Sequence, residues 1–216
     1  MQKFKGLRQA SHFGPTLIVT AIAFAFGTYY WWEGPAYVIA FTVATGQLVV
    51  GWSNDLYDFE DDLKHNRTNK PLVSGLITQK YLQRWLSFMV PFSFFANLFG
   101  PLGFKGGMVY MLGIACGVAY NFYFKFSALS PLPYAIAFAA LPSSIAISKD
   151  ITPPVWMWLG GALFGMAAHF INVIKDMEQD QTSGIKGLPQ RLGSKKSIAV
   201  AAALIATGAL AIFFSR

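Results

Sequence analysis

The sequence predicts an all-helical protein that crosses a membrane several times. Of its 216 residues, 54% are apolar and only 12% are charged, whereas a soluble domain carries roughly 25% charged residues. The chain also contains seven apolar segments that are each about 20 residues long, which is the length needed to cross a bilayer. These observations exclude a soluble globular enzyme, and the high apolar content excludes a disordered chain.

The first two apolar segments cover residues 14–32 and 35–53. The first ends in the aromatic cluster Tyr29–Trp32, which is typical of a membrane interface, and its run is too long for a cleavable signal peptide. The five later segments cover residues 81–100, 107–125, 130–148, 153–172 and 197–214. Gly113-x-x-x-Gly117 and Gly161-x-x-x-Gly165 predict close helix contacts, because small residues allow backbones to approach each other.

The cations predict the orientation of these segments. If the connections alternate between two sides, 14 of the 17 Lys and Arg residues fall on the side of the N-terminus, and Lys105, Lys149 and Arg216 fall on the other. The positive-inside rule places the first side in the cytoplasm, with the C-terminus outside. The excess of Lys and Arg residues is therefore explained by the orientation of the protein in the membrane, and no nucleic-acid partner is expected. We expect a multi-pass protein of the cell membrane.

The acids gather in two places, each directly after an apolar segment. One cluster lies within residues 55–62 and the other within residues 176–180, and only Glu33 and Asp150 lie elsewhere. If the helices continue, the i,i+3 and i,i+4 spacing puts the carboxylates and one amide of each cluster on a single helix face. The two faces comprise Asn54, Asp55, Asp58 and Asp62 in the first cluster, and Asn172, Asp176 and Asp180 in the second.

Such oxygen-rich faces suit Mg²⁺, which is commonly held by a few carboxylates together with substrate phosphates. No His or Cys is interleaved with these acids, which argues against zinc or iron. The alternative is a solvated loop face whose acids are balanced by nearby Lys and Arg residues. Two matching clusters at the same membrane face favour the metal site, with its active centre at the cytoplasmic side.

These residues resemble a known family. The run Asn54–Asp62 is similar to the NDxxDxxxD motif of the UbiA superfamily of intramembrane prenyltransferases, and Arg67–Leu72 resembles its RTxxRPL continuation, with Lys70 in place of the usual Arg. Asp176–Asp180 resembles the second, DxxxD-type motif of the family. Tyr120–Lys125 resembles the Tyr/Lys signature of the helix between the two motifs, with a looser spacing.

The resemblance implies a role for each matching residue. The metal ligands would be Asn54, Asp55, Asp58, Asp62, Asp176 and Asp180, with Asp55 the weakest of the set. The diphosphate of the substrate would be contacted by Arg8, Arg67, Lys70, Tyr120 and Lys125. The residues implied in catalysis are Asp58, Asp62, Lys125, Asp176 and Asp180. Three of these positions have a second interpretation: Lys125 and Arg8 as cationic topology anchors, and Tyr120 as an interfacial aromatic residue.

The family pattern has nine transmembrane helices, whereas this sequence predicts about seven around a central cavity. Residues 1–216 are expected to form a single transmembrane domain that lacks the last two family helices. The cavity would then open to lipid, be sealed by a second copy in a homo-oligomer, or belong to a shortened version of a longer protein.

The function implied by the resemblance is Mg²⁺-dependent transfer of a prenyl group from a prenyl diphosphate to a lipophilic acceptor, usually aromatic, through an allylic carbocation. Two alternatives use the same motifs: a membrane terpene cyclase and a polyprenyl-phosphate phosphoribosyltransferase. A cation-binding transporter belongs to a different class. Its weakness is that the acids lie at one mouth of the predicted bundle, with none along a path through the membrane.

Overall fold

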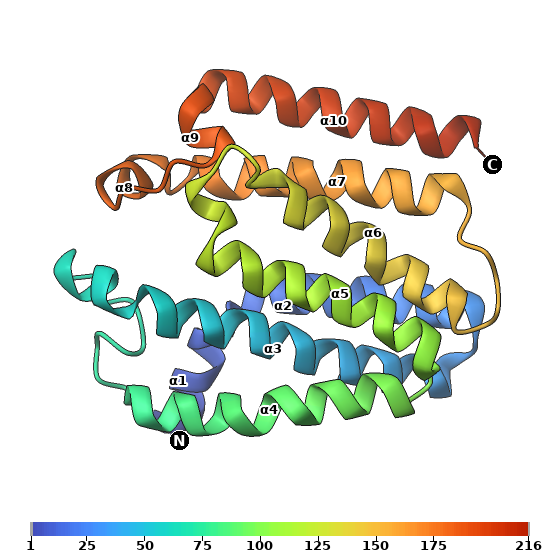
Figure 1. The fold of residues 1–216 in the computed structure, drawn as a ribbon, viewed down its shortest axis with the longest axis horizontal. Coiled ribbons are helices and arrows are strands. Elements are labelled where there is room, and N and C mark those ends of the chain that lie inside the picture. The colour runs from blue at the N-terminus through green and yellow to red at the C-terminus, as the bar shows by residue number, and fades with distance from the viewer. Residues whose placement is uncertain (1, 216) are drawn as a thin grey trace. The chain divides into compact units, whose positions relative to one another are not determined.

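Helices account for nearly all of the chain. The computed structural model describes residues 2–215, apart from the side chains of Gln179 and Gln181. Within that range there is no strand, so the predicted all-helical fold class is confirmed. Arg216, one of the cations predicted for the outer side, lies outside the described residues. Figure 1 shows the elements, which are α1 (Gln2–Ala10), α2 (Phe13–Tyr30), α3 (Glu33–Lys64), α4 (Gln79–Phe99), α5 (Gly103–Phe122), η1 (Phe124–Phe126), α6 (Pro131–Ile147), α7 (Val155–Ile174), α8 (Met177–Thr182), α9 (Leu188–Leu192) and α10 (Ser194–Phe214).

Each of the seven predicted apolar segments coincides with a long helix, namely α2, α3, α4, α5, α6, α7 and α10. By length and composition, four helices in the described part of the chain can cross a membrane: α2, α3, α7 and α10. Helix α6 is also apolar but shorter, at 17 residues.

The chain forms two compact units, residues 1–107 and residues 108–216. In the first unit α3 packs against both α2 and α4 (Figure 1). A Cβ atom added to Gly27 on α2 would lie only 2.9 Å from the Cβ of Ala36 on α3, so these helices touch closely. On the other side, the buried Asn97 of α4 donates its Nδ2 to the Thr42 carbonyl of α3 at 3.1 Å. The single domain predicted over residues 1–216 stays a prediction.

Helix α3 is longer than the predicted span. The sequence predicts a polar loop from residue 54 to residue 80, but α3 continues to Lys64, so the first eleven residues of this loop are helical. The helix ends where Asn66 adopts a left-handed conformation with φ 51°. At 1.5 Å per residue its 32 residues extend roughly 48 Å, longer than the bilayer's hydrocarbon core of about 30 Å. The first acid cluster therefore lies on helical turns beyond the length of one span.

Helix α1 is not among the predicted elements, because nine residues are too few for a clear apolar period. Helix α1 is fixed to the first unit by a close approach at a glycine and by a hydrogen bond. A Cβ atom at Gly6 would lie 2.6 Å from Ile77 Cγ2, and the indole Nε1 of Trp52 on α3 donates to the Leu7 carbonyl at 3.0 Å. The turn between α1 and α2 is thus placed beside the end of α3 that carries the acids.

In the second unit α7 packs against α6 and α10 (Figure 1). The predicted close contact through Gly161 and Gly165 is confirmed: a Cβ atom at Gly161 would lie 2.5 Å from the Phe138 carbonyl, and one at Gly165 would collide with the Tyr134 carbonyl. Between the apolar segments 153–172 and 197–214 the sequence predicts a polar loop over residues 173–196. The structure forms the short helices α8 and α9 within it.

We expect Gly165→Val to destabilise the second unit, because the added side chain has to push α6 away from α7. Overpacking of this kind costs roughly 1–3 kcal/mol, which corresponds to a fall of about 5 °C in the Tm of the purified protein. Gly14→Ala is the matched control, because nothing lies within 4 Å of a Cβ atom at Gly14. Equal Tm values for the two variants would contradict the proposed helix contact.

Candidate active site

The first acid cluster occupies the last three turns of α3. Asp55 and Asp62 are almost fully buried, with 2% and 1% of their surfaces exposed. Asn54 and Asp58 are only half-buried, and the Asn54 Nδ2 donates to Asp58 Oδ2 at 3.0 Å. The predicted helical face is therefore present, and it contains two kinds of carboxylate: those covered by protein and one that is accessible.

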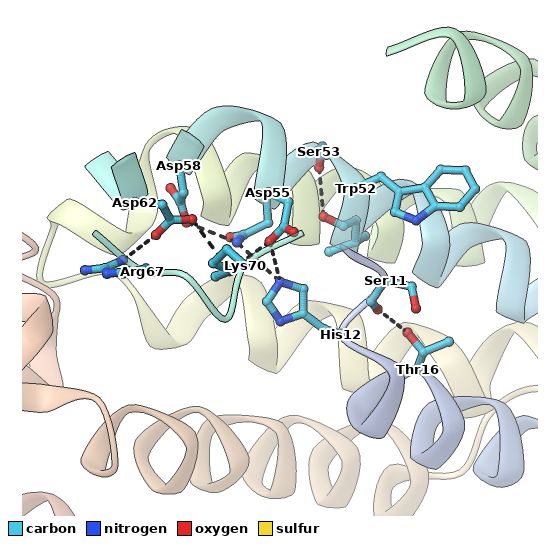
Figure 2. Close-up of polar contacts among 12 residues, drawn as sticks. Ser11, His12, Thr16, Trp52, Ser53, Asp55, Asp58, Asp62, Arg67 and Lys70 are labelled. Carbon is cyan, nitrogen blue, oxygen red and sulfur yellow. Dashed lines mark hydrogen bonds and ion pairs between the residues drawn. The ribbon is translucent and has the colours of Figure 1, made fainter. Parts of the chain in front are cut away.

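Two cations from the segment after α3 fold back onto the buried carboxylates (Figure 2). Arg67 Nη1 lies 2.7 Å from Asp62 Oδ1, and Lys70 Nζ lies 2.8 Å from Asp55 Oδ1 and 3.9 Å from Asp62 Oδ2. Arg67 also reaches Asp61 at 3.4 Å. Because a buried carboxylate is costly unless it is paired, these contacts offset part of the cost of burying Asp55 and Asp62. The acids of this face are thus not a solvated loop surface.

The pKa of Lys70 reflects this environment. Burial alone would lower the pKa of the ammonium, but the nearby carboxylates of Asp55, Asp62 and Asp58 outweigh burial and raise the pKa above its ordinary value. Lys70 is therefore fully protonated at neutral pH and remains a fixed positive charge beside the acidic face.

A histidine that the sequence reasoning did not place in the site also joins this cluster. His12 lies in the turn between α1 and α2, and its Nε2 is 3.3 Å from Asp55 Oδ1 and 3.5 Å from Asn54 Nδ2. No periodicity relates residue 12 to residue 55, so the contact could not be read from spacing. The only available signal was that His12 precedes a helix predicted to start at the same membrane face.

The residues of this cluster fit a hard cation such as Mg²⁺. The accessible donors, Asn54 and Asp58, offer oxygen atoms and no sulfur, which is the ligand chemistry that Mg²⁺ prefers. Asp55 Oδ2 is a buried carboxylate oxygen with no hydrogen-bond partner. Within the described residues, the side chains do not already converge as three His, Cys, Asp or Glu groups around one point.

The second acid motif begins in the turn between the end of α7 and the start of α8 and continues into α8. Asp176 is exposed and Asp180 is half-buried, and the Asp180 N–H donates to the Asp176 carbonyl at 2.8 Å, so the two lie one helical turn apart. The predicted stack with Asn172 is wrong, because α7 ends at Ile174 and Asn172 is hydrogen-bonded to Tyr134.

Asp180 is held by a residue that the motif does not include. Gln190 of α9 donates its Nε2 to Asp180 Oδ2 at 2.8 Å and is itself buried. Two residues earlier, the Leu188 N–H donates to the buried Ser130 hydroxyl at 2.9 Å. The loop after the second motif is therefore tied to the core of its own unit. Only its position ten residues after the end of the DxxxD pattern could have pointed to Gln190.

The remaining predicted site residues differ in their surroundings. Lys125 lies in η1 with only 5% of its surface exposed and with Nζ 5.3 Å from the centre of the Phe126 ring. This burial argues against a topology anchor that reaches outward. Tyr120 is half-buried, and its ring lies edge-on to Tyr134 with centroids 5.1 Å apart. Arg8 is exposed in the last turn of α1, over the Phe13 ring.

Comparisons with known proteins identify relatives of this chain. The family model described as the UbiA prenyltransferase family matches residues 13–215. A digeranylgeranylglyceryl phosphate synthase of Sulfolobus acidocaldarius is 25% identical over 190 residues, covering 77% of this chain. The match spans 59% of the length of that relative.

Solved structures show the same fold. A UbiA homolog from Archaeoglobus fulgidus bound to DMAPP and Mg²⁺ superposes with a TM-score of 0.80 at 17% identity, covering 100% of this chain and 77% of that chain. A structure of a UbiA homolog from Archaeoglobus fulgidus bound to GPP and Mg²⁺ gives a TM-score of 0.76 at 17% identity, covering 98% of this chain and 76% of that chain.

We expect Lys70→Met to destabilise the first unit, because it removes the lysine ammonium from the buried Asp55 and leaves that carboxylate its contact with the His12 ring. Removing one partner of a buried pair costs roughly 3 kcal/mol, which corresponds to a fall in Tm of about 5–10 °C. Lys80→Met removes an exposed lysine of α4 and serves as the control. Adding Asp55→Asn to Lys70→Met should recover part of the loss, since the unpaired charge is then removed. Equal Tm values for Lys70→Met and Lys80→Met would contradict the ion-pair account.

Proposed function

Because the chain belongs to the UbiA prenyltransferase family, we propose that it transfers a prenyl group from a prenyl diphosphate to a lipophilic acceptor. The observation that carries the proposal is the first acid cluster. It combines accessible oxygen donors, Asn54 and Asp58, with two cations, Arg67 and Lys70, that buried carboxylates hold in place. Such a combination suits a diphosphate bound together with a divalent metal.

The chain is a multi-pass helical membrane protein, as its family and its apolar helices indicate. We place the reaction at the cytoplasmic face, because the connections that carry both acid motifs also carry most of the Lys and Arg residues. An apolar environment beside the motifs would accommodate the isoprenoid tail and keep bulk water from the reacting carbon.

Each acid motif is proposed to bind Mg²⁺, through Asn54, Asp58 and Asp62 in the first unit and through Asp176 and Asp180 in the second. When bound, Mg²⁺ would stabilise the negative charge of the diphosphate group. The similar structures of UbiA homologs from Archaeoglobus fulgidus bound to Mg²⁺ with DMAPP or GPP support this ligand class.

The residues of this chain would act on the diphosphate by position and charge. Arg67 and Lys70 bind its oxygens and offset the negative charge that grows as the C–O bond to the prenyl group breaks. The bonding electrons leave with the diphosphate, and the allylic carbocation is attacked by the electron-rich acceptor, which then loses a proton. Lys125 is assigned to diphosphate contact in the second unit, and Tyr120 to orienting the phosphate or the acceptor.

Arg8 is proposed as a more peripheral contact, because it is exposed at the end of α1. The acceptor class has two candidates with separate support. The family resemblance favours an aromatic ring, and the name of the Sulfolobus acidocaldarius relative, digeranylgeranylglyceryl phosphate synthase, favours a glyceryl phosphate. Purified protein given Mg²⁺ and prenyl diphosphates of several lengths should therefore be offered acceptors of both classes, with the products separated by mass spectrometry.

We expect Asp58→Ala and Asp176→Ala each to reduce pyrophosphate release by at least about 100-fold, since losing one group that stabilises developing charge costs roughly that much. Glu60→Ala and Glu178→Ala are matched controls, because both side chains are exposed acids beside the motifs. They should stay within about twofold of wild type, in line with surface substitutions.

Other products would select other functions. A cyclic hydrocarbon formed without acceptor would favour a terpene cyclase, and transfer from a phosphoribosyl donor would favour a phosphoribosyltransferase. Cation uptake into vesicles without any pyrophosphate release would favour a transporter. Unchanged pyrophosphate release in both Asp→Ala variants would end the prenyltransferase proposal.

A further inference from the structure

The turn between α1 and α2 is held in one place against α3. A Cβ atom at Gly51 would lie 2.8 Å from the carbonyl carbon and oxygen of Ser11, so the turn touches the α3 backbone directly. Ser11 is 2% exposed, and its carbonyl accepts from Thr16 Oγ1 at 2.7 Å. The hydrogen bond from the Trp52 indole to the Leu7 carbonyl of α1 adds a second attachment. Because these contacts lie within one helical turn of the first acid motif, they fix where the next residue, His12, can reach.

His12 occupies an uncommon backbone conformation at this position. Its φ of 51° and ψ of 59° lie in the left-handed region, which few residues other than glycine adopt and which costs roughly 1–2 kcal/mol. Backbone strain of this kind persists where surrounding contacts impose it, and it is concentrated at functional sites. Here the imposed conformation directs an imidazole ring onto the motif, with Nε2 3.3 Å from Asp55 Oδ1 (Figure 2).

Asp55 differs from its neighbours in what surrounds it. Both His12 and Lys70 contact the same oxygen, Oδ1, while Oδ2 is buried without a hydrogen-bond partner. Asp55 is thus enclosed by protein, whereas Asn54 and Asp58 are half-buried and accessible. Both of these polar contacts of Asp55 are through Oδ1, and burial to 2% exposure keeps the carboxylate from the surface that Asn54 and Asp58 share.

We propose that His12 is a positioning residue of the first motif and that Asp55 is its anchor, not a metal ligand. This inference rests on the proposed function. In the tautomer or charge state that carries a proton on Nε2, His12 donates to Asp55 Oδ1, 3.3 Å away, in preference to the 3.5 Å contact with Asn54 Nδ2. This bond fixes the Asp55 carboxylate against Lys70. The ammonium of Lys70 then keeps one position beside Asp62, and Asn54 and Asp58 remain available to Mg²⁺ and diphosphate.

The test measures metal binding directly, using Mn²⁺ as the probe for the Mg²⁺ site and inorganic pyrophosphate as the anion. The full-length protein in detergent is titrated with Mn²⁺ in the presence of pyrophosphate, and free Mn²⁺ is followed by electron paramagnetic resonance. Loss of a residue in the shell around the metal ligands commonly weakens metal binding by 10- to 100-fold. We therefore expect His12→Ala to weaken Mn²⁺ binding by about 10-fold.

Two further variants separate positioning from simple structural support. His12→Gln retains an N–H donor in place of the ring Nε2, and should bring Mn²⁺ binding back to within about threefold of wild type. His65→Ala is the matched control, because His65 also contacts a carboxylate at 3.3 Å, that of the more exposed Asp61. It should leave Mn²⁺ binding unchanged. A purely structural role of His12 would lower Tm without changing the Mn²⁺ affinity of the folded protein, and that result would overturn the proposal.

Asp55 and Asp58 are compared in the same titration. Asp55→Asn should weaken Mn²⁺ binding only moderately, by about 10-fold, because asparagine keeps the acceptor oxygen, whereas Asp58→Asn should remove detectable binding. Equal and complete loss in both variants would make Asp55 a ligand and overturn the inference. If the wild-type protein itself binds no Mn²⁺ with pyrophosphate, the proposed function fails. Wild-type binding that His12→Ala leaves unchanged contradicts this inference alone.

Discussion

The burial of two carboxylates at the end of α3 is the constraint on which the site depends. Asp55 and Asp62 are taken almost completely out of water, and an isolated charge in such a place would cost several kcal/mol. The segment after α3 has to fold back so that Arg67 and Lys70 can reach them. The cations that follow the acidic motif therefore stabilise the fold itself, whether or not a substrate is bound. Without them the last turns of α3 would carry unpaired buried charge.

The same constraint explains why α3 is so long. A helix that ended at the predicted boundary, residue 53, would leave the acids on irregular backbone, where their i,i+4 alignment is lost. Contacts along its first half, at Ala36 with α2 and at Thr42 with α4, fix its position laterally. The last turns then extend as a rigid continuation of that packed helix. A rigid helix holds side chains more accurately than a loop does, which suits the metal and diphosphate binding proposed for this site.

The long helices and the motif residues could be predicted from the sequence, and the contacts of His12 could not. Apolar runs of about 20 residues locate a helix whatever it packs against, so all seven predicted segments became helices. Helical spacing alone predicts that Asn54 and Asp58 lie on the same face of one helix. His12 and Gln190, by contrast, meet Asp55 and Asp180 only because a turn and a short helix pack in particular places. Such placement depends on tertiary contacts, which local periodicity does not encode.

Burial separates acids that look identical in the sequence. Asp55, Asp58 and Asp62 all match one motif, yet Asp55 and Asp62 are covered and bound by protein cations, whereas Asp58 is accessible and shares a hydrogen bond with Asn54. A carboxylate that holds a buried cation gains most by keeping that partner, because releasing it would leave both charges unpaired. An accessible carboxylate loses little when a metal ion replaces its present contact. The acidic motif therefore combines, in one residue type, carboxylates that hold Arg67 and Lys70 in place and an accessible carboxylate, Asp58, that a metal ion can reach.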